Sequence, residues 1–148
     1  MLKTLRTCAA AACAVAALAA IAAPAVAGVP DFFGTWRPSS PNVRDITRVD
    51  VRQAGGRIYV HVWGACQPVD CDWGEVAGRA YAPDVGAPLW PSADLIVAQF
   101  DKPMEQTTVE LRPAGGGLNY QALTSFQYGS GFHVNVRSDY HHGGRLYH

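Results

Sequence analysis

Residues 47–63 read TRVDVRQAGGRIYVHVW, and they carry the clearest secondary-structure signal in the chain. In 47–52, apolar or β-branched residues alternate with charged ones, which is the period-two pattern of a half-buried strand. The Ala-Gly-Gly triplet at 54–56 supplies the conformational freedom of a tight turn, and a second run follows in 57–63. This stretch therefore predicts an antiparallel β-hairpin.

The same period of two recurs along the rest of the chain, and no stretch after Gly28 sustains a helical pattern. Further strands are predicted at 34–37, 73–81, 94–100, 106–112, 118–126 and 132–139. About eight short strands joined by Gly-containing turns are typical of a small antiparallel up-and-down barrel. A two-sheet β-sandwich is the alternative. Closure is favoured because an open sheet would leave two exposed edges.

Two segments refine the all-β prediction. Residues 82–93 contain three prolines, so we expect a surface loop across one barrel end with Trp90 beneath it. In 73–81, alternation places Gly74 and the other small residues on one face and Trp73 on the other. Small residues on one face suit the tapering interior of a small barrel.

The N-terminus has the three parts of a secretory signal. Lys3 and Arg6 precede an alanine-rich run over 7–23, and Ala25-Val26-Ala27 offers small residues before a cleavage point. We therefore predict a signal peptide over 1–27 and a single domain over 28–148. The domain is expected to be exported, to the periplasm or outside the cell, with no membrane span after signal cleavage.

The charge balance argues against a polyanionic partner. The chain has 12 basic and 12 acidic residues, and the signal removes two basic residues and no acidic one. A slightly acidic domain without a basic run gives no electrostatic reason to expect nucleic acid.

Cysteine usage points to one disulfide. Cys8 and Cys13 lie in the signal, so Cys66 and Cys71 are the two cysteines of the exported domain. An oxidising compartment favours a disulfide between them. A redox pair usually has two intervening residues at a helix start, and a zinc site needs two more ligands. We expect a disulfide that fixes the turn, with Asp70 and Asp72 accepting hydrogen bonds there.

Gly34-Thr35-Trp36 resembles the Gly-x-Trp entry strand of lipocalin-like and avidin-like barrels, in which the tryptophan plugs one end. A closer resemblance is to uncharacterised secreted bacterial proteins, through the Cys-x-Pro-x-Asp-Cys-Asp-Trp-Gly box at 66–74 and the Val-His-x-Trp-Gly strand at 60–64. The resemblance implies a calycin-like barrel and export, and it implies no activity. The core residues that we expect are Trp36, Val49, Val51, Val134 and Val136.

Four residues that bracket the cysteine turn form the candidate ligand-binding wall: Tyr59, His61, Trp63 and Trp73. Aromatic faces give contact area at low entropic cost, and a histidine adds a hydrogen bond that changes near neutral pH. The competing hypothesis is that the same four residues form only a structural collar, that is, they pack around the turn and hold its conformation without binding a ligand.

The sequence contains no recognisable catalytic constellation, so an enzyme is the least favoured function class, and no cofactor is expected. His141, His142 and His148 cluster near the C-terminus, where a transition-metal site and an ordinary polar tail are the two interpretations. No metal site is assigned.

The leading function hypothesis is a binding module for an unknown small molecule, and the alternative is an envelope-associated protein-interaction or inhibitor domain. An open barrel interior would favour the small molecule. A filled interior with an exposed aromatic patch around Trp90 would favour the protein partner.

Overall fold

The computed structural model describes residues 27–128, 131–132 and 140–148. Its elements in chain order are the 3-10 helix η1 (Val29–Phe32), β1 (Gly34–Pro38), β2 (Ile46–Ala54), β3 (Arg57–Gly64), β4 (Cys71–Tyr81), α1 (Leu89–Ser92), β5 (Leu95–Lys102), β6 (Glu105–Ala114), β7 (Gly117–Tyr128), β8 (Gly131–Phe132) and β9 (Tyr140–Tyr147). The two helices have four residues each, so the described chain is almost all β-structure.

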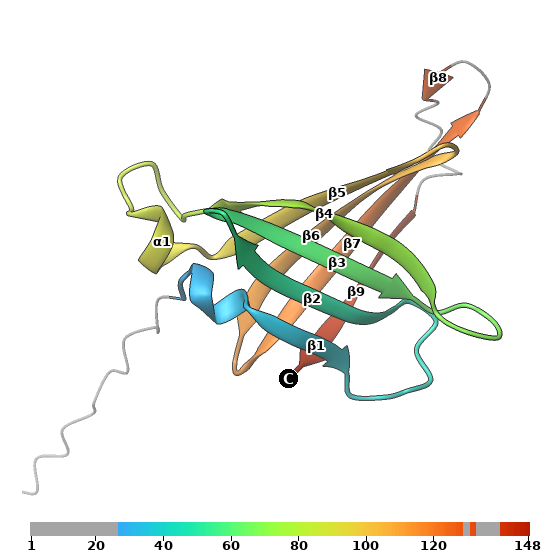
Figure 1. The fold of residues 1–148 in the computed structure, drawn as a ribbon, viewed down its shortest axis with the longest axis horizontal. Helices are drawn as coiled ribbons and strands as arrows, with labels where there is room; N and C mark the ends of the chain where they lie inside the picture. Colours follow the sequence, from blue (N-terminus) through green and yellow to red (C-terminus); the bar gives the residue numbers. More distant parts are fainter. Residues whose placement is uncertain (1–26, 129–130, 133–139) are drawn as a thin grey trace, which may run out of the picture.

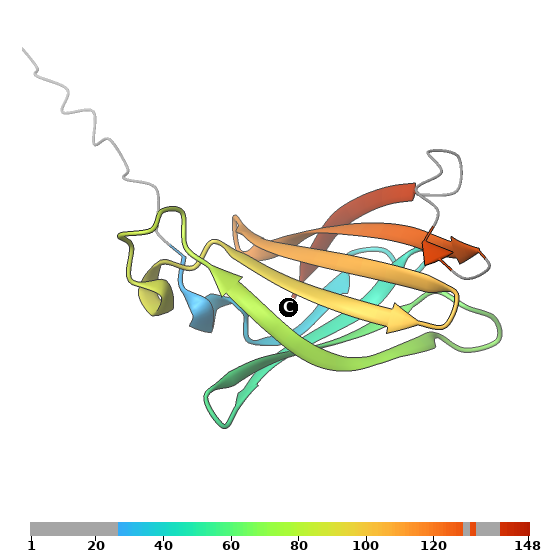
Figure 2. The ribbon, with the colours of Figure 1, turned by 90° about the horizontal axis from the view of Figure 1, so that it is seen from above.

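Eight of the strands close into an antiparallel barrel (Figures 1 and 2). Strands β1 to β6 pair in sequence order, β6 pairs with β7, and β9 lies between β7 and β1 to complete the ring. The two-residue strand β8 pairs only with the end of β7. The predicted small up-and-down barrel is confirmed, and the strands do not divide into the two sheets of a sandwich.

The β2–β3 hairpin forms where the alternation predicts it. Gly55 and Gly56 have φ of +55° and +74°, the left-handed backbone that a two-residue hairpin turn requires. The register pairs Val49 with Val62 and Val51 with Val60, and these valines face the interior with almost no exposed surface. Burial of one strand face fixes this register, because a one-residue slip would move every valine to the surface.

The interior is packed with apolar side chains that form one cluster. Trp36, Val49 and Val51 belong to it, as expected. Val134 and Val136 lie outside the described residues. The Trp36 indole Nε1 donates a 2.8 Å hydrogen bond to the carbonyl of Phe32, so η1 covers the end of the barrel at which Trp36 lies.

The C-terminal segment is a strand, and the interpretation of it as a polar tail is wrong. Strand β9 pairs with β7 along most of its length, from Leu118 opposite Leu146 to Thr124 opposite Tyr140. The pairs His141-His142 and Gly143-Gly144 interrupt the alternation of apolar and polar residues in this strand. Most of the strand expected at 132–139 lies outside the described residues.

The expected loop over 82–93 contains the one-turn helix α1, which packs against η1 at the same barrel end (Figure 1). Trp90 contacts Phe33 with ring centroids 6.2 Å apart, but 47% of its surface is exposed. The expectation that Trp90 lies beneath the loop is therefore wrong. Pro88, at the helix N-cap, and Pro91 place the indole on a short rigid turn at the rim.

Candidate functional site

The four residues of the expected ligand wall do not share one face. Tyr59, His61 and Trp63 point outward from β3, opposite the buried Val60 and Val62, as predicted. Trp73 instead packs against the interior cluster.

The cause is a β-bulge in β4. Asp72 lies opposite Trp63 and Gly74 lies opposite Val62, so Trp73 is an extra residue between them. The bulge turns Trp73 inward, where its ring meets Phe100 edge-on at 5.9 Å. Gly64 leaves the room that it needs, because a Cβ atom there would lie 2.7 Å from the indole nitrogen.

The outward rings of β3 are covered by their neighbours. The Arg48 guanidinium lies 3.2 Å from the Trp63 ring centroid, and the His61 ring stacks on Trp63 at 3.7 Å and 12°. Two groups at these distances cannot share one side of the indole, so they occupy opposite sides. Trp63 therefore has no free ring face for a ligand.

Carboxylates of β4 complete this network. Nε2 of His61 lies 2.5 Å from Oδ1 of Asp72, an oxygen that also accepts the Gly74 N–H at 2.7 Å. These hydrogen bonds hold the pKa of Asp72 below its ordinary value. Arg52 binds Glu75 through two hydrogen bonds, of 2.7 and 2.5 Å, and lowers the pKa of that carboxyl.

Arg52 also lies 4.7 Å above the Tyr59 ring. Each of the three outward rings on β3 is thus engaged by a partner on the protein itself. This geometry supports the collar hypothesis over the ligand wall.

Two interactions fix the cysteine turn at residues 66–71. Cys66 and Cys71 form a disulfide. The Thr47 hydroxyl of β2 donates a 2.7 Å hydrogen bond to Asp70, which anchors the turn to the neighbouring strand. Asp72 accepts a backbone N–H, as expected, whereas Asp70 accepts a side-chain hydroxyl.

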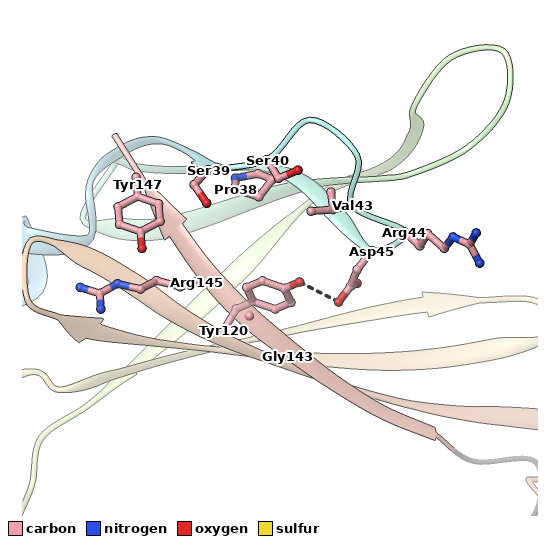
Figure 3. A pocket seen from close by; sticks show the side chains of 11 residues that line it. Pro38, Ser39, Ser40, Val43, Arg44, Asp45, Tyr120, Gly143, Arg145 and Tyr147 are labelled. Atoms are coloured by element: carbon pink, nitrogen blue, oxygen red, sulfur yellow. Dashed lines mark hydrogen bonds between the residues drawn. The ribbon is translucent and has the colours of Figure 1, made fainter.

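A pocket of about 360 Å³ lies where the barrel wall is least complete (Figure 3). Strands β1 and β9 pair only through Arg37–Tyr147 and Pro38–Leu146, and beyond that point the 39–45 connection runs beside β9. We call this region the seam. The pocket is lined by the 39–45 connection, by Tyr120 of β7 and by the 143–145 part of β9.

Asp45 connects the two sides of the seam, because it contacts residues of β7 and β9. Its Oδ2 accepts a hydrogen bond from the Tyr120 hydroxyl at 2.7 Å, and Nδ1 of His142 lies 2.5 Å from the same oxygen. Burial and the Asp45 hydrogen bond raise the pKa of Tyr120. Oδ1 of Asp45 is buried without a hydrogen-bond partner among the described residues. In Figure 3, Arg44 extends away from this pair of side chains.

A groove of about 460 Å³ lies beside α1 at the other end of the barrel. We call it the α1 groove. Its apolar lining includes Val29, Ile58, Ala80, Leu89 and Trp90, and Arg57 and Arg79 also border it. Sequence reasoning named Trp90 but missed the groove, because residues from η1, β3 and β4 reach it only in the closed barrel.

The exposed large apolar side chains concentrate near this groove. Among the described residues, four of the eight lie between 81 and 90: Tyr81, Val85, Leu89 and Trp90. Exposed apolar side chains that gather at one part of a protein surface commonly mark an interaction site.

The side chains of His142 and His148 contact different parts of the protein, and the side chain of His141 lies outside the described ones. His142 binds Asp45 at the seam, whereas the His148 ring contacts Trp36 with centroids 3.7 Å apart. Over the described ranges, no group of three or more His, Cys, Asp or Glu side chains is placed to hold a metal ion.

In the part of the chain that the structure describes, no helix is long and apolar enough to cross a membrane. Comparisons with protein-family models, curated proteins and solved structures find no match for this chain.

Proposed function

We propose that this protein is an exported interaction domain that binds a partner protein through the α1 end of its barrel. The observation that carries the proposal is the exposed apolar group on the β4–β5 connection, where Leu89 and Trp90 are about half exposed beside a groove. Aromatic and aliphatic anchors of this kind dominate the energetics of protein interfaces.

The packed interior supports the same proposal. The apolar cluster fills the space between the strands, and the hollows described above lie at the barrel end and at the seam. A lipophilic ligand held between the strands would have to displace fully buried side chains such as Phe100 and Ile96. Creating such a void costs several kcal/mol.

The test compares complexes in protein purified gently from producing cells. The Leu89→Ala/Trp90→Ala variant removes the anchors, and Met104→Ala is the control, because Met104 is 61% exposed in the β5–β6 turn at the opposite end. Native mass spectrometry should show a protein complex for wild type and for Met104→Ala, and free protein for the double variant. A complex that survives the double variant would overturn the proposal.

A small polar ligand at the seam is the second candidate, and one observation favours it. The buried Oδ1 of Asp45 is an acceptor without a partner among the described residues, next to a pocket of suitable size. In that case the same spectra should show a bound mass of a few hundred daltons, and Asp45→Asn should remove it.

A further inference from the structure

The α1 groove combines an apolar hollow with two unneutralised positive charges. Ile58 on β3 lies opposite Gly78 on β4, so the next pair in this antiparallel register is Arg57 and Arg79. Both point outward and both are exposed. Like charges on facing positions of two strands repel each other and destabilise the pair.

Neither arginine forms a hydrogen bond or an ion pair within the described residues. By contrast, Arg48, Arg52 and Arg112 each lie within 4 Å of a carboxylate.

Two carboxylates of this region are already engaged by other groups. Glu75, on the same strand as Arg79, is held by both hydrogen bonds from Arg52. Asp84, in the connection that leads to α1, accepts the Gly86 N–H at 2.8 Å. The positive edge of the groove is therefore left for a group from outside the chain.

We propose that the α1 groove binds an acidic segment of a partner protein, with an apolar side chain in the hollow and a neighbouring Asp or Glu on Arg57 and Arg79. This inference rests on the proposed function and names the chemistry of its partner. The groove volume accommodates one large side chain with part of its backbone. Guanidinium groups recognise carboxylates through paired hydrogen bonds, and opposite charge speeds the encounter.

The experiment places a photoreactive amino acid at Val85, which is fully exposed at the tip of the connection and does not line the groove. Cross-linking is carried out in producing cells on four backgrounds. These are the otherwise wild-type chain, Trp90→Ala, Arg57→Glu/Arg79→Glu, and the control Arg37→Glu. Arg37 is an exposed arginine of β1 that likewise has no ion pair among the described residues and does not line the groove.

We expect a discrete protein adduct on the wild-type and Arg37→Glu backgrounds, in yields that agree within about twofold. Charge reversal at Arg57 and Arg79 should lower the yield at least tenfold, as expected for buried or partly buried interfacial charge pairs. The cross-linked partner peptide, sequenced by mass spectrometry, should contain an apolar residue within two positions of an Asp or Glu.

The two proposals fail differently. An adduct that needs Trp90 but is unchanged by charge reversal overturns the acidic-partner inference and leaves the interaction domain standing. An adduct to lipid, or none at position 85 on any background, overturns both. Circular dichroism of each purified variant verifies that the barrel is intact, so that loss of the adduct reports binding.

Discussion

The Tyr120 hydroxyl on β7 donates a 2.7 Å hydrogen bond to Asp45, although β9 lies between β7 and the start of β2. Tyr120 reaches across because it is paired with Gly144, where a Cβ atom would lie 2.9 Å from the tyrosine ring. The bond joins residues 75 positions apart and holds the seam where β1 and β9 separate.

Replacing Tyr120 by Phe should lower the free energy of unfolding by about 1–3 kcal/mol, because the Asp45 carboxylate loses the hydrogen bond that Tyr120 donates. Urea denaturation measures the loss. Tyr147→Phe is the matched control, since Tyr147 is 40% exposed and its hydroxyl has no hydrogen bond within the described residues. Equal losses in the two variants would show that the seam bond contributes no stability.

The two tryptophans at the η1 end should differ strongly in their contribution to the free energy of unfolding. Trp36 is buried and hydrogen-bonded to Phe32, so Trp36→Ala should cost about 3–5 kcal/mol. Trp90 is half exposed, so Trp90→Ala should cost less than about 1 kcal/mol. Denaturant melts of both variants decide this, and a large loss for Trp90→Ala would mean that the indole supports the barrel end.

Alternation was sufficient to predict most of the barrel, since a sheet with one buried face imposes period two on the sequence. It did not predict β9, because Gly143 and Gly144 have no side chains and so interrupt the alternation of apolar and polar residues there. Those glycines are needed because a side chain at 144 would collide with Tyr120. That requirement is a tertiary one and leaves no local signal.

The four residues of the expected ligand wall lie on two different faces for a related reason. Strict alternation assigns Trp73 to the outer face, and a single bulge residue reverses that assignment. Contacts between distant segments, such as Asp45 with Tyr120 or α1 with η1, exist only after closure. The disulfide was predictable from the cysteine number together with the expected oxidising compartment, without any knowledge of the geometry.

Acid should destabilise the protein through the β3–β4 face. The pKa values of Asp72 and Glu75 are lowered in the folded state by His61 and Arg52, respectively. A lowered folded-state pKa contributes stability above the unfolded value near pH 4, and that contribution is lost as the pH falls through the folded pKa. Unfolding free energies measured from pH 6 to pH 2 should fall below about pH 4.

The Asp72→Asn variant should show a shallower fall over the same range, because its side chain cannot be protonated. Asp94→Asn is the control, since the Asp94 side chain makes no ion pair within the described residues. Identical pH profiles for wild type and Asp72→Asn would rule out a contribution from the His61–Asp72 pair.

Removing the disulfide should lower the free energy of unfolding only modestly. Cys66 and Cys71 are five positions apart, and a loop this short stabilises by about 2 kcal/mol on the chain-entropy model. Cys66→Ser/Cys71→Ser should therefore melt at lower denaturant with the same fold. Alkylation of freshly exported wild type without reductant should add no mass, and two free thiols would contradict the oxidised state.

The N-terminal end of the domain connects the expected signal cleavage with stability. The backbone nitrogen of Gly28 donates a 2.7 Å hydrogen bond to Asp31 and lies against α1, where a Cβ atom would come within 2.9 Å of the Trp90 carbonyl. Cleavage after Ala27, the expected signal site, would convert this nitrogen into an ammonium group. The hydrogen bond would then be charge-assisted at both ends and stronger than a neutral one.

A double-mutant cycle measures this gain. Four proteins are compared: chains that begin at Gly28 or retain Ala27, each with Asp31 or with Asp31→Asn. We expect Asp31→Asn to cost about 0.5–1 kcal/mol more in the chain that begins at Gly28, a range typical of a solvent-screened ion pair. The difference should shrink in 1 M salt, because screening weakens exposed charges. Equal costs in both chain lengths would show that the new amino group adds nothing to the bond already made by the Gly28 amide.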